Sequence, residues 1–334
     1  VFPEVALSSV PMFSLHYIAF FCVYNCIEKP EHLKFIIIPI LLSLLLESLL
    51  AIVQWRLPYF RIGAIDAVQD HMIWRSHGTF FHSNVLGMFL IIFLPLIFRL
   101  IIISYLLKRK TRVVVLGVLF GLGVIALMVS QNRGSWVGFI VAMFFVTIYD
   151  IIRNRSRARK ILIRLMIPAT IFLIVFIMVF GDWFYYRLFM DDAEAQVEGR
   201  IELQVDALDI IREHPVIGIG KGNYRHFTNQ EFTHNLFYLF AAEMGFTGLF
   251  FFLMILAVWA RYIWKGIHSN VLAVKNIMLA MGTSMIGFFI ASIPGPDFLL
   301  RPELGVNLWV LIGVSVGLVR IERRYDIRYV RAYL

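Results

Sequence analysis

Residues 84–105 read NVLGMFLIIFLPLIFRLIIISY, and Arg99 is the one charged residue in this run. A helix of this length, rising about 1.5 Å per residue, can cross the roughly 30 Å of hydrocarbon in a bilayer. Comparable runs recur along the whole chain, which is 60% hydrophobic and 16% charged and has a mean hydropathy of +0.79. Because a soluble domain carries about 25% charged residues, the sequence predicts an all-α fold, a polytopic transmembrane helical bundle.

Apolar windows long enough to span a membrane predict about nine transmembrane helices. They cover residues 9–27, 33–53, 84–105, 112–130, 135–152, 161–181, 246–264, 271–293 and 306–320. No internal repeat or linker divides the chain, so we expect a single membrane domain over residues 1–334. Two long connections remain, an external loop at 54–83 and a large external loop at 182–245. The second is expected to be partly helical, because apolar residues recur at helical spacing, at Ile201, Val205, Leu208 and then Ile211 or Arg212.

Lys and Arg near the ends of spans remain in the cytoplasm, so their positions predict the orientation. Basic clusters fall in alternate connections, at Lys108–Arg112, Arg153–Lys160, Arg261–Lys275 and Arg320–Arg331. The intervening connections, 54–83, Ser130–Ser135 and 182–245, are therefore expected outside. The net charge of +9 follows from the basic loops and needs no nucleic-acid partner. The lipid bilayer is the predicted partner, and function is to be sought on the non-cytoplasmic side.

Two arginines are candidates for binding an anion on that side. Arg133 lies in the short turn between two predicted spans, which would hold its guanidinium near the external ends of both helices. Arg200 begins the amphipathic helix predicted in the large loop. A guanidinium binds phosphate oxygens in a bidentate manner, whereas the alternative for each residue is an arginine that reaches lipid headgroups or lies at a helix end. Arg75, in the first external loop, is a further candidate.

His234 stands where the large loop turns apolar and re-enters the membrane. Imidazole can take a proton from a sugar hydroxyl near neutral pH, although a lone histidine at an interface is often a hydrogen-bonded structural residue. Asn235 and Glu243 are candidates for support. On one unbroken helix His234 and Glu243 would be half a turn out of phase, so we do not expect a simple dyad. Glu47 is a further candidate, because an acid within a membrane span commonly serves function.

No motif in the sequence requires a metal or a cofactor. There is no His-Glu-x-x-His, no Gly-x-Ser-x-Gly and no clustered set of Cys and His. Gly218–Gly222 resembles a nucleotide-binding loop only superficially, because no strand precedes it, and we interpret it as a turn. Cys22 and Cys26 lie one helical turn apart in an apolar stretch, where a disulfide is geometrically awkward. We therefore expect no metal, no cofactor and no redox chemistry.

An ordered set of short motifs over residues 76–250 resembles the O-antigen ligase family, which also includes surface-polysaccharide polymerases. The set consists of Gly78-Thr79-Phe80-Phe81-His82-Ser83-Asn84 before a span, Asn132-Arg133-Gly134-Ser135-Trp136 in the hairpin, Arg200, His214-Pro215-Val216-Ile217-Gly218-Ile219-Gly220, and His234-Asn235-Leu236 followed by Glu243-Met244-Gly245 and Gly248-Leu249. Asn132 stands where the family usually has serine. Each motif is short, and their order carries the resemblance.

The resemblance implies a membrane glycan transferase of the bacterial cytoplasmic (inner) membrane, with its active site facing the periplasm or exterior. The expected donor is a glycan on a polyprenyl pyrophosphate, and the expected acceptor is another glycan or a lipid-linked sugar. Arg133 and Arg200 would then bind the donor pyrophosphate and His234 would act on the acceptor hydroxyl. Transfer would need no metal or nucleotide, and direct displacement would invert the anomeric carbon.

Other functions remain open at the level of the sequence. Within the family, a polymerase and a ligase differ only in the acceptor, which the external loops do not decide. A transporter or flippase of lipid-linked glycans would place polar residues through the midplane and often has repeated halves, whereas here polar residues gather near the external ends. A non-catalytic scaffold would use its external arginines only to hold anionic lipid, and Arg133→Lys would then be harmless.

Overall fold

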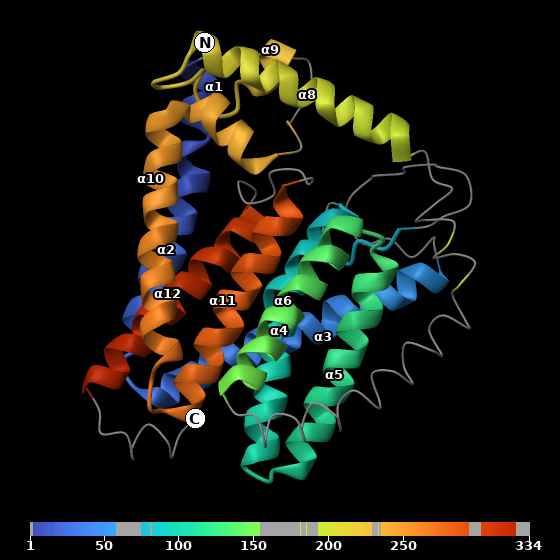
Figure 1. Ribbon diagram of the computed structural model, residues 1–334, viewed down its shortest axis with the longest axis vertical. Helices are drawn as coiled ribbons and strands as arrows, with labels where there is room; N and C mark the ends of the chain where they lie inside the picture. Colours follow the sequence, from blue (N-terminus) through green and yellow to red (C-terminus); the bar gives the residue numbers. More distant parts are fainter. Residues whose placement is uncertain are drawn as a thin grey trace.

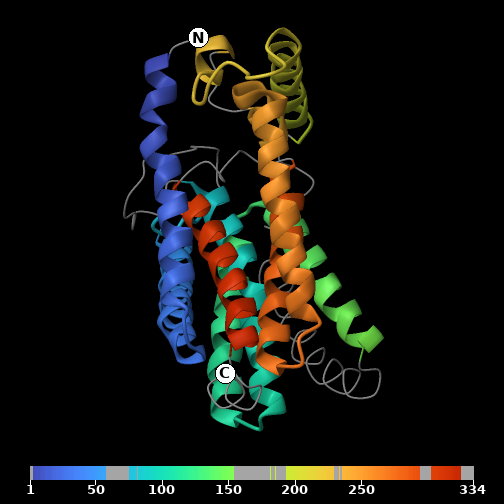
Figure 2. The same cartoon turned by 90° about the vertical axis from the view of Figure 1, so that its left-hand side faces the viewer.

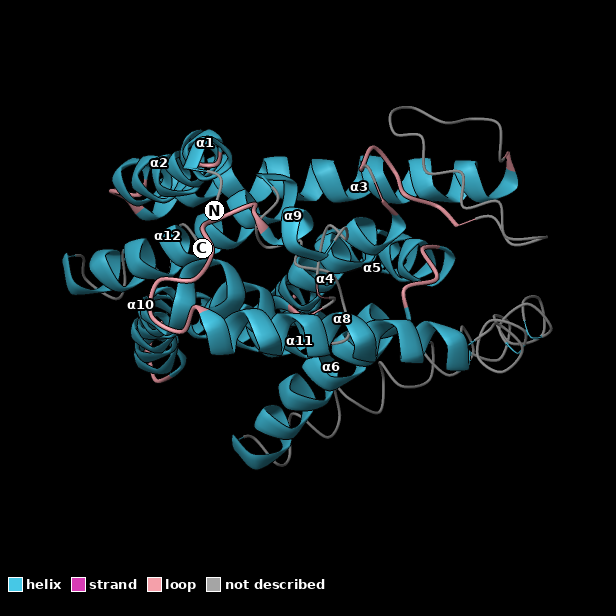
Figure 3. Cartoon of the chain, turned by 90° about the horizontal axis from the view of Figure 1, so that it is seen from above, coloured by secondary structure: helices cyan, strands magenta, loops and turns pink. Residues whose placement is uncertain are grey.

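The computed structural model describes residues 3–57, 75–80, 82–153, 181, 185, 193–228, 233, 235–293 and 302–324. Within this part of the chain all regular structure is helical, and no strand occurs (Figure 3). Seven of the described helices are long and apolar enough to cross a membrane. The prediction of an all-α, polytopic membrane protein is confirmed.

The helices have the following bounds: α1 (Pro3–Ser8), α2 (Val10–Cys26), the 3-10 helix η1 (Pro30–Leu33), α3 (Lys34–Arg56), α4 (Ser83–Leu106), α5 (Lys110–Val129), α6 (Arg133–Arg153), α8 (Ala193–Glu213), α9 (Tyr224–Thr228), α10 (Leu236–Ile267), α11 (Leu272–Ser292) and α12 (Pro302–Arg324). The count of about nine spans is not confirmed. The predicted span 9–27 corresponds to α2, which at 17 residues is shorter than the seven. The predicted span 161–181 lies, except for its last residue, outside the described residues.

Helix α4, which contains the run quoted first, lies inside the bundle and packs against α5, α6 and α11 (Figure 1). A helix that is apolar on all sides is covered by other helices or by lipid, and here nearly every residue of α4 is buried. The helices around it instead expose apolar side chains such as Leu46 on α3, Val114 on α5 and Ile140 on α6. In a bilayer these surfaces would contact lipid.

The two ends of the bundle differ in what they carry. Helices α8 and α9 lie beyond one end, which we call the α8 end (Figures 1 and 2). The α4–α5 and α10–α11 connections lie at the opposite end (Figure 1). The basic clusters Lys108–Arg112 and Arg261–Lys275 therefore lie at the same end of the bundle, as their alternation in the sequence predicts.

Two features of the large loop differ from the sequence prediction. Helix α10 begins at Leu236, ten residues before the predicted span at 246, because its first turns precede a break at Gly245. The predicted apolar stripe of helix α8 is buried only at its end, where Ile211 is buried together with Ala207 and Ile210, whereas Ile201, Val205 and Leu208 are exposed. Helix α8 packs against α10, and its buried side chains lie toward its C-terminal half.

A buried ion pair joins three central helices. Arg99 of α4, only 3% exposed, donates to Asp150 of α6 over 2.5 Å and to the side-chain oxygen of Asn276 of α11. A charge placed in an apolar interior is tolerated only when it is paired and hydrogen-bonded. The one charged residue of the quoted run therefore ties α4 to two helices that lie far from it in the sequence.

Replacing Arg99 by methionine is expected to destabilise the bundle by about 3–5 kcal/mol, because the partly buried Asp150 carboxylate would lose the guanidinium to which it is hydrogen-bonded. The measurement is the free energy of unfolding in mixed micelles. Adding Asp150→Leu should recover most of the loss. The control is Arg212→Met, which breaks a pair with Asp209 whose side chains are 74% and 59% exposed, and it should change stability by less than about 1 kcal/mol. Equal losses in Arg99→Met and the control would contradict the prediction.

Candidate functional site

The hairpin between α5 and α6 is a hydrogen-bonded turn at the α8 end of the bundle. Gln131 adopts a left-handed backbone conformation (φ 55°) that reverses the chain. The side-chain oxygen of Asn132 accepts from the backbone N–H of Ser135 at 3.2 Å, and the Trp136 indole donates to the carbonyl of Leu127 at 2.9 Å. Arg133 is the first residue of α6, and its side chain is half-buried. The predicted placement of Arg133 in a short turn between two helices is confirmed.

Arg75 belongs to the same polar group. Its guanidinium donates to the side-chain oxygen of Asn84 at 2.6 Å, and the Asn132 side chain donates to the Asn84 carbonyl at 3.1 Å. The helices approach closely here, since a Cβ at Gly87 of α4 would lie 2.7 Å from the Ser135 hydroxyl. The start of α4 and the start of α6, each with a positive dipole end, therefore lie next to Arg75 and Arg133, and their combined field favours an anion.

Glu47 supports the segment that carries Arg75. Its carboxylate, 9% exposed on α3, accepts from the Thr79 hydroxyl at 2.5 Å and from the Thr79 backbone N–H at 2.9 Å. Gln54, two turns further along α3, accepts from the backbone N–H groups of His77 and Gly78 and donates to the Gly78 carbonyl. The sequence could not identify a partner for Glu47, and the structure shows that it is Thr79. The contacts of Glu47 with Thr79 stabilise the turn at Gly78 and Thr79.

The start of α10 is fixed by Asn235. Its side-chain oxygen accepts from the backbone N–H groups of Phe237 at 3.0 Å and Tyr238 at 3.3 Å, as an N-cap does. His234, the residue before it, lies outside the described residues. Arg200 lies on α8, and its side chain is likewise not described. Of the three groups predicted to carry the chemistry, the structure therefore describes the side chain of Arg133.

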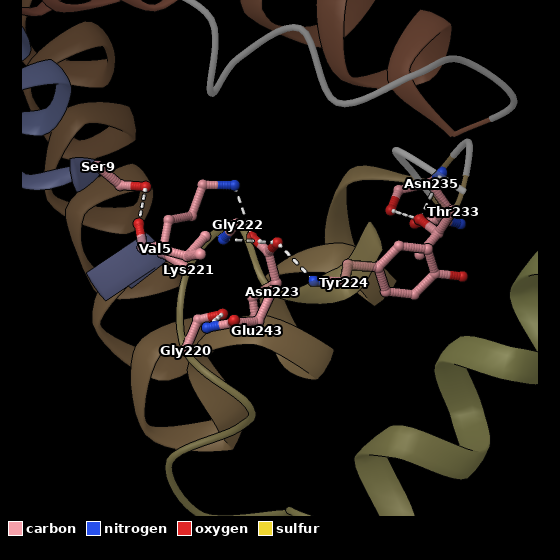
Figure 4. Close-up of polar contacts among 10 residues, drawn as sticks. All are labelled: Val5, Ser9, Gly220, Lys221, Gly222, Asn223, Tyr224, Thr233, Asn235 and Glu243. Atoms are coloured by element: carbon pink, nitrogen blue, oxygen red, sulfur yellow. Dashed lines mark hydrogen bonds and ion pairs between the residues drawn. The ribbon is translucent and has the colours of Figure 1, made fainter. Parts of the chain in front are cut away.

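Glu243 faces the segment Gly218–Gly222, which forms a turn as predicted (Figure 4). Its carboxylate accepts from the Lys221 ammonium at 2.5 Å and from the Gly222 backbone N–H at 2.8 Å. The sequence identified Glu243 as a candidate but missed Lys221 as its partner. The only local signal was a lysine inside a glycine-rich turn, which would be expensive to bury without an acid.

Tyr224, the first residue of α9, links this turn to α8. Its hydroxyl donates to the Leu203 carbonyl at 2.8 Å. Burial raises the pKa of the Tyr224 hydroxyl to about 12, so this group stays protonated and remains a donor throughout the physiological range. Sequence reasoning did not single out Tyr224, because an aromatic residue near a membrane interface is commonplace.

Residues 118–253 match the family model described as O-Antigen ligase. The chain carries an O-antigen ligase domain. The resemblance stated from the motifs is thereby confirmed. No curated protein matches the chain. The domain, together with the seven helices of membrane-spanning length, supports an O-antigen ligase-type membrane glycan transferase that takes part in polysaccharide biosynthesis.

The O-antigen ligase domain contains most of the candidate residues. Its range covers the hairpin with Arg133, helix α8 with Arg200, and the start of α10 with Glu243. Glu47 and Arg75 lie before it in the sequence, and the fold brings Arg75 to the hairpin through Asn84 and Asn132. Among the described residues, no group of three His, Cys, Asp or Glu side chains is placed to hold a metal ion.

Proposed function

We propose that this protein transfers a glycan from a polyprenyl pyrophosphate to an acceptor sugar at the outer face of a bacterial cytoplasmic membrane. The observation that carries the proposal is that the O-antigen ligase domain contains a half-buried arginine, Arg133, at a hydrogen-bonded turn at one end of an apolar bundle, and that this turn is linked to Arg75 through Asn84 and Asn132. A pyrophosphate attached to a lipid reaches the protein at this depth of the membrane, at the level of the headgroups.

The orientation of the site follows from the basic residues. Lys108–Arg112 and Arg261–Lys275 lie at the end opposite to α8 and α9. Because basic residues near spans are retained in the cytoplasm, the α8 end is assigned to the periplasm or the exterior. The site would then act on glycans that have already crossed the membrane, where nucleotide-activated sugars are not available as donors.

The chemistry is a direct displacement at the anomeric carbon of the donor sugar. The acceptor hydroxyl oxygen forms the new bond to this carbon, the bond to the pyrophosphate oxygen breaks, and the hydroxyl proton passes to His234. Negative charge develops on the leaving pyrophosphate, and Arg133 and Arg200 would neutralise it as preorganised cations. The positive end of the α6 dipole adds to this field. Displacement from the opposite face inverts the anomeric carbon.

The test is glycan transfer by the purified protein in lipid vesicles, from a polyprenyl-pyrophosphate oligosaccharide to a glycan acceptor, with EDTA present. We expect transfer to continue in EDTA and the new linkage to have the inverted anomeric configuration by NMR. Comparing a lipid A core acceptor with a second copy of the lipid-linked glycan separates a ligase from a polymerase. Activity lost in EDTA and restored by Mg²⁺, or movement of the donor across the bilayer without transfer, would refute the proposal.

A further inference from the structure

Helix α10 is broken near its start, and the glycine-rich turn fills the break. Gly245 has a non-helical backbone conformation (φ 65°, ψ −178°), which separates residues 236–244 from the rest of α10. The carbonyls of Ala242 and Glu243 accept from the backbone N–H groups of Ile219 at 3.0 Å and Gly220 at 2.8 Å. A Cβ at Gly245 would lie 2.2 Å from the Val216 carbonyl oxygen. The turn is therefore seated directly against the first segment of α10.

The Glu243 carboxylate occupies the position that a bound anion takes in a glycine-rich loop (Figure 4). One of its oxygens accepts from the backbone N–H groups of Gly222 at 2.8 Å and Tyr224 at 3.5 Å, and the other accepts from Lys221 at 2.5 Å. The side chains of Glu243 and Lys221 are 3% and 16% exposed. Backbone N–H groups at the start of a helix attract negative charge, and here the chain supplies that charge itself.

The same carboxylate is connected to α8 through Tyr224. The tyrosine is fully buried, and its backbone N–H faces Glu243 while its hydroxyl donates to Leu203 on α8. Leu203 lies three residues after Arg200, about one helical turn. The segment of α10 that carries Glu243 begins two residues after His234. One connected set of polar contacts thus joins α8, one turn after Arg200, to Glu243 in the first segment of α10, which follows His234 in the chain.

We propose that Glu243, Lys221 and Tyr224 form a clasp that fixes the distance between α8 and the start of α10, which makes Glu243 a positioning residue for the transfer reaction. The inference rests on the proposed function, in which Arg200 binds the donor and His234 acts on the acceptor. Misplacing reacting groups by about 1 Å can lower a rate by about 10²-fold. A clasp that only stabilised the fold would change the amount of folded protein and leave the rate of each folded molecule unchanged.

The first variant is Tyr224→Phe, which keeps the buried ring and removes the hydroxyl that contacts α8. We expect kcat for each folded molecule to fall by about tenfold, KM for the donor to stay within about twofold, and the melting temperature to change little, because a single hydrogen bond is lost. The matched control is Tyr262→Phe, near the opposite end of α10, which should leave kcat unchanged. An unchanged kcat in Tyr224→Phe would overturn the inference.

The second test uses the buried pair. Glu243→Gln leaves Lys221 charged without its partner, so kcat should fall further than in Tyr224→Phe. Adding Lys221→Met removes the unpaired charge, while the glutamine oxygen can still accept from Gly222. The double variant should therefore recover kcat to within about fivefold of the wild type. A double variant no better than Glu243→Gln alone would contradict the clasp.

A distance measurement separates this inference from the proposed function. After Cys22 and Cys26 are replaced by serine, spin labels at Val205→Cys on α8 and Tyr238→Cys on α10 report the spacing of the two segments. The distribution should be narrow in the parent and broader in Glu243→Ala. Unchanged widths would overturn the clasp even in an active enzyme, whereas a parent with a narrow distribution and no glycan transfer would overturn the proposed function alone.

Discussion

His234→Ala is expected to lower the rate of glycan transfer by about 10²–10⁴-fold, the contribution of a positioned general base. The acceptor hydroxyl must lose its proton as it attacks, and alanine offers no group to receive it. The loss should appear in kcat, with little change in KM for the donor, because the donor pyrophosphate is held by the arginines. The measurement is initial transfer rate in vesicles at saturating donor, for equal amounts of folded protein.

The matched control for His234 is His268→Ala. His268 follows the last residue of the same helix, α10, at the end opposite to α8. Its ring contacts the Trp264 carbonyl over 2.8 Å, so the variant reports any general effect of removing a histidine from this helix. If both variants kept full activity, His234 would have no part in the chemistry, and the acceptor hydroxyl would need another base.

Arg133→Lys is expected to lower transfer by about 10²–10³-fold, even though it keeps the positive charge. The planar guanidinium can hold two phosphate oxygens at once, whereas an ammonium is a compact point charge that contacts them singly. Removing one hydrogen-bond donor aimed at a developing negative charge lowers kcat by about 10²–10³-fold in enzymes that catalyse acyl transfer, and we expect a similar effect for the charge that develops on pyrophosphate. The variant should still fold, because the contacts that fix the hairpin come from Asn132, Ser135 and Trp136.

The control for Arg133 is Arg212→Lys. Arg212 lies at the end of α8, on the same end of the bundle, and its side chain is 74% exposed. This variant should retain full transfer activity. If Arg133→Lys also retained full transfer, a point charge would suffice at this position, and the bidentate pyrophosphate site at Arg133 would be wrong.

The sequence was sufficient for features that depend on a short stretch of chain. A membrane helix satisfies its backbone hydrogen bonds within its own segment. The apolar runs that form α4, α5, α6 and α11 could therefore be located from composition alone. The hairpin with Arg133 was found because only a few residues separate two predicted spans, and Gly218–Gly222 was interpreted as a turn because no strand precedes it. The order of these motifs also predicted the O-antigen ligase domain, which the match over residues 118–253 confirms.

Contacts between segments that lie far apart in the chain could not be predicted from the sequence. The partner of Glu47, Thr79, lies 32 residues away, and Arg99 reaches Asn276 across 177 residues. The reasoning about His234 and Glu243 assumed that both lie on one unbroken helix, whereas α10 begins at Leu236, after His234. The direction in which Glu243 points is set by the turn packed against it, which no periodicity in its own helix could reveal.

The sequence by itself thus determined that this protein is a bundle of membrane helices, because each apolar segment must cross the hydrocarbon by itself. Only the tertiary structure decided which polar residues meet. Arg75 is linked to the Arg133 hairpin by hydrogen bonds to Asn84, and Glu243 forms an ion pair with Lys221. The physical reason is that a buried polar group takes whichever partner the packing of the helices brings within hydrogen-bonding distance, and this packing depends on the whole chain at once.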